Sequence, residues 1–138
     1  LNVAMENALI NNTIVDFRQD DILNPSCGLP TAGIIVSNPP YVRYSEKKLM
    51  HLNVLGFEPH QALFVPDDDP LLFYRALLNI ANEILLPGGR VYFEINEAFG
   101  KEMADLLGSF GYSGIEIIKD LNGKDRFATG LRQWNVRN

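Results

Sequence analysis

The residues best suited to chemistry are Asn38-Pro39-Pro40-Tyr41, which directly follow the apolar run at residues 33–37. Two consecutive prolines fix the backbone and remove two N–H donors, so the loop is stiff and presents acceptors. These acceptors are chiefly the side-chain oxygen of Asn38 and the carbonyl of Pro39, and Tyr41 adds an aromatic face. Because ligands bind at the carboxyl ends of strands in open α/β sheets, we predict a binding site at this loop.

Such a loop suits the transfer of a group to a planar amide or amino nitrogen. That nitrogen is a poor nucleophile because its lone pair is delocalised. Two acceptors that hold its two hydrogens would orient it and stabilise the positive charge that grows during attack. The ring of Tyr41 could stack on the planar group and favour the same charge. The alternative is a rigid turn without function, since Asn-Pro commonly starts turns.

An α/β fold is predicted to position this loop. Apolar runs that do not alternate are typical of parallel strands covered on both faces, and they lie at residues 13–17, 33–37 and 91–95. A helix between the second and third runs predicts a βαβ crossover. Asn122-Gly123 lies between strand-like runs at residues 115–119 and 126–131, which predicts a hairpin. We therefore expect parallel strands that end in an antiparallel C-terminal hairpin.

Three helices are predicted. Residues 1–11 indicate the end of an amphipathic helix. Asp69-Pro70 is a helix-start signature, with Asp69 as N-cap, for a helix over residues 71–86 that is ended at residues 87–89. The apolar face of this helix is predicted to hold Phe73, Leu77, Ile80 and Ile84. A further helix is predicted over residues 99–110.

Composition sets limits on fold and function. The chain has 138 residues, of which 46% are hydrophobic, as expected of one compact domain. Its net charge of −5 argues against a partner held mainly by its phosphates, so nucleic acid is not expected as the direct substrate. The single cysteine, Cys27, excludes an internal disulfide and fits a reducing compartment such as the cytoplasm. No apolar run reaches the roughly 20 residues that cross a bilayer.

Other polar residues give no pattern of a metal site. The acidic run at residues 67–69 lacks the spaced ligands and the glycine of a calcium loop, and it indicates a solvated linker. His51, His60 and Cys27 match no compact metal-ligand spacing. We therefore predict no metal site.

The loop at residues 38–41 resembles that of class I methyltransferases, which use S-adenosylmethionine and in this group methylate planar amino groups. The chain around it is similar to the HemK-type (PrmC) family, which methylates the glutamine of the Gly-Gly-Gln motif in peptide-chain release factors. The supporting matches extend over nearly the whole chain: Asn7-Ala8, Asp21, Glu58-Pro59, Ala62-Leu63, Tyr74-Arg75, Leu86-Pro87-Gly88-Gly89, Glu94-Ile95, Asp120-Leu121, Gly123 and Asp125-Arg126. The resemblance implies a protein-glutamine N-methyltransferase with S-adenosylmethionine as its cofactor and release factors as its partners.

Carried over by position, the resemblance implies that Asn38, Pro39, Pro40 and Tyr41 bind the substrate glutamine. Asn38, Pro39 and Tyr41 would be the catalytic residues among them. Asn38 would also bind the cofactor, beside its methyl donor.

The resemblance implies further roles elsewhere in the chain. From spacing alone, Asp20-Asp21 would cap a turn or a helix start. The resemblance assigns Asp21 and Ile22 to the adenine end of the cofactor. Glu58 and Arg75 match family positions, and each could equally be a member of a surface ion pair.

By the same resemblance, residues 1–138 are expected to be the C-terminal part of one methyltransferase domain, without the N-terminal helical domain and the glycine-rich cofactor loop. The partial Rossmann-like sheet would keep strands 3, 4, 5, 6 and 7 of the family order 3-2-1-4-5-7-6. The strand predicted at residues 13–17 would lose its neighbours, so we expect it to repack, fray or pair with another chain. Asn96 stands where many relatives have glycine, so the resemblance does not predict the backbone conformation at this position.

Two alternatives stand beside glutamine methylation. A DNA or RNA adenine methyltransferase would use the same loop on a flipped base, but the acidic balance and the lack of basic clusters weigh against it. The other alternative is an inactive fragment that keeps the substrate loop but cannot bind the cofactor alone. We expect inactivity of the chain by itself, because no Gly-x-Gly sequence occurs in it.

Overall fold

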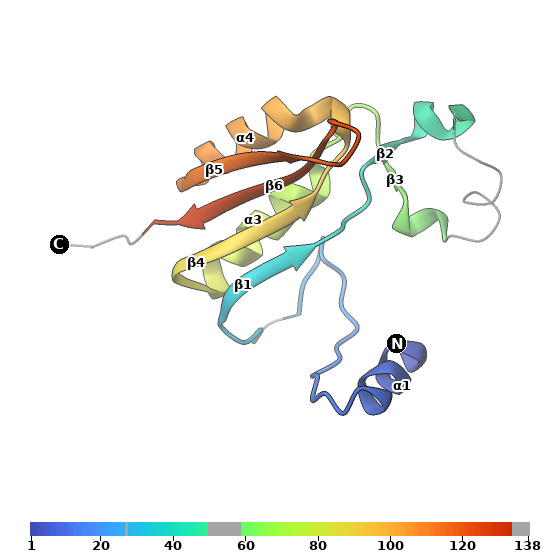
Figure 1. The fold of residues 1–138 in the computed structure, drawn as a ribbon, viewed down its shortest axis with the longest axis vertical. Coiled ribbons are helices and arrows are strands. Elements are labelled where there is room, and N and C mark those ends of the chain that lie inside the picture. The colour runs from blue at the N-terminus through green and yellow to red at the C-terminus, as the bar shows by residue number, and fades with distance from the viewer. Residues whose placement is uncertain (27, 50–58, 134–138) are drawn as a thin grey trace.

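The computed structural model describes residues 1–26, 28–49 and 59–133. Its centre is a sheet of four strands in the spatial order β1, β4, β6, β5 (Figure 1). The strands are β1 (Ala32–Ser37), β4 (Leu85–Glu94), β5 (Tyr112–Lys119) and β6 (Asp125–Arg132). β1 is parallel to β4, whereas β6 is antiparallel to both β4 and β5. The predicted parallel strands with an antiparallel C-terminal hairpin are confirmed, and their order matches the 4-5-7-6 part of the family order.

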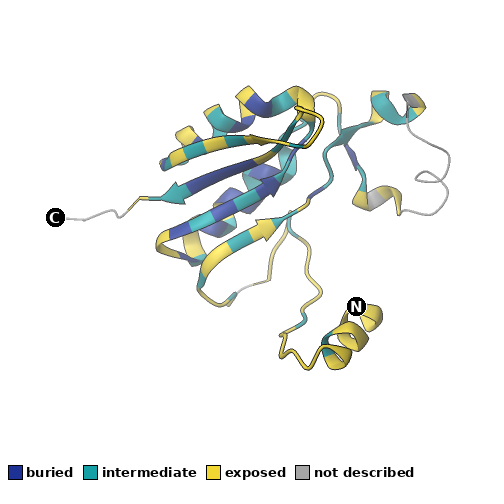
Figure 2. Cartoon of the chain, viewed as in Figure 1, coloured by how far each residue is buried: buried dark blue, intermediate teal, exposed yellow. Residues whose placement is uncertain are grey.

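Two helices complete the core. α3 (Leu72–Ile84) lies between β1 and β4 in the chain, and α4 (Gly100–Ser109) precedes the hairpin (Figure 1). The predicted crossover and both predicted helices are therefore confirmed. In Figure 2 the ribbon of buried residues is dark blue, and it lies mainly in these helices and strands. The side chains that form one hydrophobic cluster are those of Tyr74, Leu77, Leu78, Ala81, Leu85, Val91, Phe93, Ile95, Met103, Leu107, Tyr112 and Ala128.

The buried face of α3 differs from the prediction. The helix buries Tyr74, Leu77, Leu78 and Ala81. The other predicted core positions are only partly buried: Phe73, Ile80 and Ile84. The contact with β4 explains the difference, because the rings of Tyr74 and Phe93 pack with their centroids 5.8 Å apart. This contact turns Tyr74, and not its neighbour Phe73, toward the sheet.

The two ends of α3 also differ from the prediction. The N-cap position is Leu71, which makes no side-chain cap, so the prediction of Asp69 as N-cap is wrong. The Asp69 carboxylate instead pairs with the guanidinium of Arg75, in the first turn of the helix. At the other end the helix stops at Ile84, and residues 87–89 already belong to β4.

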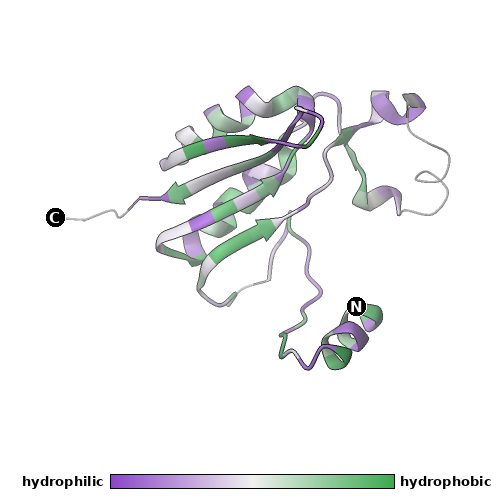
Figure 3. Ribbon diagram, in the orientation of Figure 1, coloured by the Kyte–Doolittle hydropathy of each residue, from purple (hydrophilic) through white to green (hydrophobic). Residues whose placement is uncertain are grey.

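The exposed edge of the sheet contradicts two predictions. β1 is not covered on both faces: Ile34 is 63% and Val36 is 74% exposed. Figures 2 and 3 show an apolar strand with an exposed surface at this edge. Residues 13–17 form no strand, and Ile14 is fully exposed. The segment lies outside the sheet, as expected if it frays for want of neighbours, and its pairing with another chain stays a prediction.

A small second sheet follows the Asn-Pro-Pro-Tyr loop directly. It pairs β2 (Val42–Arg43) in parallel with β3 (Phe64–Val65). The ring of Tyr44 stacks on the ring of Phe64 at a centroid distance of 5.5 Å, and both strand residues of β3 are buried. Short 3-10 helices lie beside it and after β4: η1 (Tyr44–Leu49), η2 (His60–Ala62) and η3 (Glu97–Phe99). The loop is thus held at both ends by strands.

The N-terminal helix α1 (Asn2–Ile10) is present as predicted, but it buries no residue. Figure 1 shows it apart from the central sheet, and Leu9 on it is 77% exposed. The predicted amphipathic pattern is wrong, because the apolar residues are spread around the helix and not gathered on one face. None of the helices in residues 1–26, 28–49 and 59–133 is long and apolar enough to cross a membrane.

Candidate functional site

The Asn-Pro-Pro-Tyr loop lies at the carboxyl edge of the sheet, where the sequence predicts a site. Ser37 ends β1 and is paired with Phe93 of β4. Asn38 follows the end of β1 and Glu94 is the last residue of β4, so the two residues lie at the same edge of the sheet. Asn38 is exposed, whereas Pro39 is buried. The buried proline anchors the turn, and the carboxamide of Asn38 is left accessible to a ligand.

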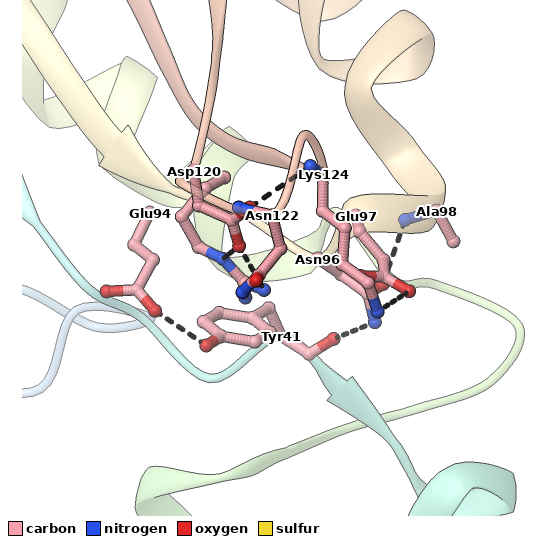
Figure 4. A network of polar contacts seen from close by, with 9 residues as sticks. Tyr41, Glu94, Asn96, Glu97, Ala98, Asp120, Asn122 and Lys124 are labelled. Atoms are coloured by element: carbon pink, nitrogen blue, oxygen red, sulfur yellow. Dashed lines mark hydrogen bonds and ion pairs between the residues drawn. The ribbon is translucent and has the colours of Figure 1, made fainter.

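Glu94 holds the ring of Tyr41 in place (Figure 4). The Tyr41 hydroxyl donates a hydrogen bond of 2.7 Å to Oε1 of Glu94. The main-chain carbonyl of Glu94 accepts a hydrogen bond of 2.8 Å from the Tyr74 hydroxyl, which ties the same residue to α3. Burial, followed by the Glu94 carboxylate, raises the pKa of Tyr41 to about 12. The phenol is therefore a neutral donor at physiological pH.

Asn96 fixes the main chain of the same tyrosine (Figure 4). Its Nδ2 donates to the carbonyl oxygen of Tyr41 at 3.2 Å and to Oε2 of Glu46 at 3.1 Å. Its Oδ1 accepts from the N–H of Ala98 at 3.0 Å. The backbone of Asn96 has φ −68°, so nothing in its conformation requires glycine. Asn96 thereby joins the loop to η1 and η3.

The C-terminal hairpin also reaches the loop. Asp120, in the turn between β5 and β6, accepts from the N–H groups of Asn122 at 2.8 Å and Lys124 at 3.1 Å. These backbone hydrogen bonds, with that of Lys124 first, lower the pKa of Asp120. Its Oδ2 contacts the guanidinium of Arg126 at 3.4 Å. The guanidinium lies close enough to the Tyr41 hydroxyl to oppose the rise in its pKa.

Two cavities lie near the predicted site residues. One of about 260 Å³ extends from the loop toward the hairpin and is lined by Tyr41, Val42, Glu46, Asn96, Glu97, Ala98 and Arg126. The other, of about 270 Å³, lies between the segment before β1 and helix α3, and is lined by Arg18, Asp20, Asp21, Ile22, Pro25, Leu29, Leu77 and Ile80. The structure thus places the two predicted adenine contacts together, in a cavity whose lining does not include Asn38.

Asp20 and Asp21 cap a turn, as their spacing alone predicts. Oδ1 of Asp20 accepts from the N–H of Ser26 at 3.1 Å, and Oδ1 of Asp21 accepts from the N–H of Leu23 at 3.0 Å. The hydrogen bonds with Ser26 lower the pKa of Asp20. Ile22 packs against the hydrophobic core cluster. The turn is therefore built independently of any cofactor, and a cofactor role for Asp21 and Ile22 stays a prediction.

The remaining candidate residues lie elsewhere or outside the described part of the chain. Arg75 forms the ion pair with Asp69 and does not line either cavity. Glu58, His51 and Cys27 lie outside the described residues. Within residues 1–26, 28–49 and 59–133, no group of three or more His, Cys, Asp or Glu side chains could hold a metal ion.

The side chains that surround Tyr41 are Glu46, Glu94, Asn96 and Arg126, and the sequence assigned a site role to none of them. Glu94 and Arg126 were singled out only as matches to the family. One of them had a usable signal. Glu94 lies near the end of the strand predicted at residues 91–95, and the carboxyl ends of neighbouring parallel strands meet at one edge. The others come from segments whose approach to the loop depends on tertiary packing.

Stability at alkaline pH should depend on Tyr41. Burial and Glu94 raise the pKa of Tyr41 to about 12, above its ordinary value of 10.0, and burial also raises that of Tyr74 and Tyr112. The native state then keeps phenol protons that the unfolded chain has lost, so stability falls as pH rises from 10 toward 12. We expect Tyr41→Phe to make this fall less steep in urea denaturation at pH 9, 10 and 11. Equal slopes in both proteins would contradict the assignment.

No protein-family model matches the chain. Curated relatives do match, over most of its length. A release factor glutamine methyltransferase of Bacteroides thetaiotaomicron is 45% identical over 133 residues, which is 96% of this chain and 48% of the relative. One of Flavobacterium psychrophilum is 45% identical over 126 residues, which is 91% of this chain and 44% of the relative. One of Staphylococcus aureus is 34% identical over 132 residues, 94% of this chain and 47% of the relative.

The chain thus spans about half the length of the curated relatives it matches, and it aligns with their C-terminal half. The mixed sheet and its strand order are consistent with part of a class I methyltransferase fold.

Proposed function

Because this chain belongs by sequence to the release factor glutamine methyltransferases, we propose that it supplies the substrate loop for methylating the side-chain amide of glutamine in the Gly-Gly-Gln motif of release factors. The observation that carries the proposal is the geometry of the loop. An exposed Asn38 and a fixed Tyr41 flank two prolines at the carboxyl edge of the sheet. This proposal implies a cytoplasmic enzyme, because release factors act in translation termination.

The residues of the loop would act by positioning and by stabilising charge. Asn38 Oδ1 and the Pro39 carbonyl would accept the two hydrogens of the amide, and Pro40 would keep the turn rigid. Tyr41, held by Glu94, would offer its face to the amide plane and favour the positive charge on the nitrogen. As the bond between the nitrogen and the methyl carbon forms, the bond between that carbon and the donor sulfur would break and leave its electron pair on the sulfur. The nitrogen would then lose one hydrogen to water as a proton. No side chain has to remove that proton before transfer.

We propose S-adenosylmethionine as the cofactor, with Asp21 and Ile22 at its adenine end and Asn38 near its methyl group. The lining of the cavity beside α3 has the chemical groups that an adenine ring would need. Ile22, Leu29 and Leu77 supply apolar surface, and Asp21 supplies a hydrogen-bond acceptor. When bound, the cofactor supplies an electrophilic methyl group. At about 270 Å³, the cavity would hold only one end of the molecule.

Cofactor affinity tests the role of Ile22. In the full natural gene product, Ile22→Ala should weaken the binding of S-adenosylmethionine about tenfold in calorimetry, because it removes apolar contact from the lining of the cavity. Leu23→Ala is the matched control, since Leu23 is adjacent, 47% exposed and absent from the lining of the cavity. Equal affinity of the Ile22 and Leu23 variants would contradict the assignment.

The position of the transferred methyl group tests the proposed function. The full natural gene product is incubated with methyl-labelled S-adenosylmethionine and either a release factor or DNA. We expect label on the glutamine amide of the release factor, located by mass spectrometry of its peptides. Label on adenine in DNA, with none on the release factor, would support the nucleic-acid alternative and overturn the proposal.

A further inference from the structure

The cavity of about 260 Å³ next to the Asn-Pro-Pro-Tyr loop is distinct from the cavity proposed for the cofactor. It is lined by residues of three separate segments, and it shares Tyr41 with the loop. A substrate whose side-chain amide lies on the face of Tyr41 has its main chain within reach of this cavity. Its volume of about 260 Å³ is below the roughly 300–1,000 Å³ of pockets for drug-sized molecules. It would admit a short piece of main chain with small side chains.

The polar groups that line the cavity differ in how many of their hydrogen-bonding atoms already have partners within the protein. Glu46 accepts from Arg43 and Asn96. Glu97 is paired with Lys124 at 2.8 Å. Both carboxylates therefore have cationic or amide partners within the protein, and the main-chain carbonyl of Tyr41 is taken by Asn96.

Arg126, whose guanidinium also lies beside the Tyr41 hydroxyl, has N–H donors left for a further acceptor. Its Nε and Nη2 both reach a single oxygen of Asp120, at 3.4 Å. Charge-assisted hydrogen bonds are usually about 2.7–2.9 Å, so these are long contacts. A guanidinium carries five N–H donors, and this one is 26% exposed. It can therefore donate to an acceptor in the cavity.

We propose that Arg126 binds a main-chain carbonyl of the protein substrate next to the acceptor glutamine. The inference rests on the proposed function and assigns a second substrate contact to the same site. The carboxylates around Arg126 favour a neutral acceptor over an anion. Glu46 and Glu97 line the same cavity, and Asp120 contacts the guanidinium. A phosphate or carboxylate would be repelled by these three groups, whereas a peptide carbonyl would not.

Substrate affinity tests the proposal on the full natural gene product. Arg126→Met removes the donors and keeps much of the volume, and Arg126→Lys keeps the charge without the planar group. For a release-factor peptide that contains the glutamine, Arg126→Met should raise the KM and the Kd from fluorescence anisotropy about tenfold or more. The kcat should change less than about threefold, because the contact is equally strong before and during transfer. Arg126→Lys should lie in between.

Two controls separate binding from structure. Lys119 is a cation near the same hairpin turn, where it pairs with Asp125, and it does not line the cavity. Lys119→Met should therefore leave the Kd for the peptide unchanged. Asp120→Asn weakens the turn but keeps the guanidinium, so it should affect the thermal midpoint more than Kd. An unchanged Kd for Arg126→Met, or an equal rise for Asp120→Asn, would overturn the inference.

The peptide assay also separates this inference from the proposed function. If the unaltered protein binds the peptide but transfers no methyl group to its glutamine, the proposed function fails and the Arg126 variants still decide the contact. If the unaltered protein does not bind the peptide, both fail.

Discussion

Asn38→Ala should lower the rate of methyl transfer to glutamine by about 10²- to 10³-fold, the range found when one preorganised hydrogen-bonding group is removed from an active site. Asn38 is the exposed polar side chain at the start of the loop, and it is proposed to hold one amide hydrogen. Without this side chain, the amide nitrogen of the glutamine is not oriented, and the positive charge that grows on it during transfer is not stabilised. Turnover is measured on the full natural gene product, with release factor and saturating S-adenosylmethionine.

The affinity for the cofactor should stay largely intact in this variant, as measured by calorimetry. Asn79→Ala is the matched control, because Asn79 is also exposed but lies on α3, away from the loop. It should keep full activity. If Asn38→Ala keeps near-normal turnover, or loses activity only in proportion to cofactor binding, the loop does not hold the substrate amide.

Glu94→Ala should lower turnover about ten- to hundredfold, because the Tyr41 hydroxyl loses a carboxylate acceptor at 2.7 Å. Hydrogen bonds to charged groups contribute about 1.5–3 kcal/mol, which corresponds to such a factor when they fix a catalytic ring. The variant should also show a lower pKa of Tyr41, since the Glu94 carboxylate contributes to its rise. Both effects follow from a single contact between β4 and the loop.

A double-mutant cycle with Tyr41→Phe separates this contact from other roles of the glutamate. If Glu94 acts through the Tyr41 hydroxyl, adding Glu94→Ala to Tyr41→Phe should cost little further activity. Glu116→Ala is the control, because Glu116 is an exposed carboxylate on β5. Fully additive losses would show that Glu94 acts independently of Tyr41.

The parallel strands, the C-terminal hairpin and the place of the loop could be predicted from sequence because local signals agree there, whereas the strand order was implied only by the family resemblance. The apolar run before Asn38, the helix that follows and the Asn122-Gly123 turn each point to the same topology. Periodicity could not predict which face of α3 is buried. Phe73 and Tyr74 are both aromatic neighbours, and only the contact with Phe93 selects Tyr74.

The surroundings of the loop depend on contacts between distant parts of the chain. Tyr41 meets Glu94 and Asn96, which are 53 and 55 residues away in the sequence. Such contacts leave no periodic pattern, so periodicity could not place Asn96 and Arg126 at the site, although Asp125-Arg126 is one of the family matches. The exposed side of β1 was missed for a related reason: an apolar run reports that a strand can be buried, not that another element covers it.

The most direct test of the account is a crystal structure of the full natural gene product with a glutamine-containing release-factor peptide. The account predicts that the amide nitrogen of the glutamine lies within hydrogen-bond distance of Asn38 Oδ1 and the Pro39 carbonyl oxygen, with its plane against the ring of Tyr41. A peptide bound with its glutamine amide away from these two oxygens would contradict the account.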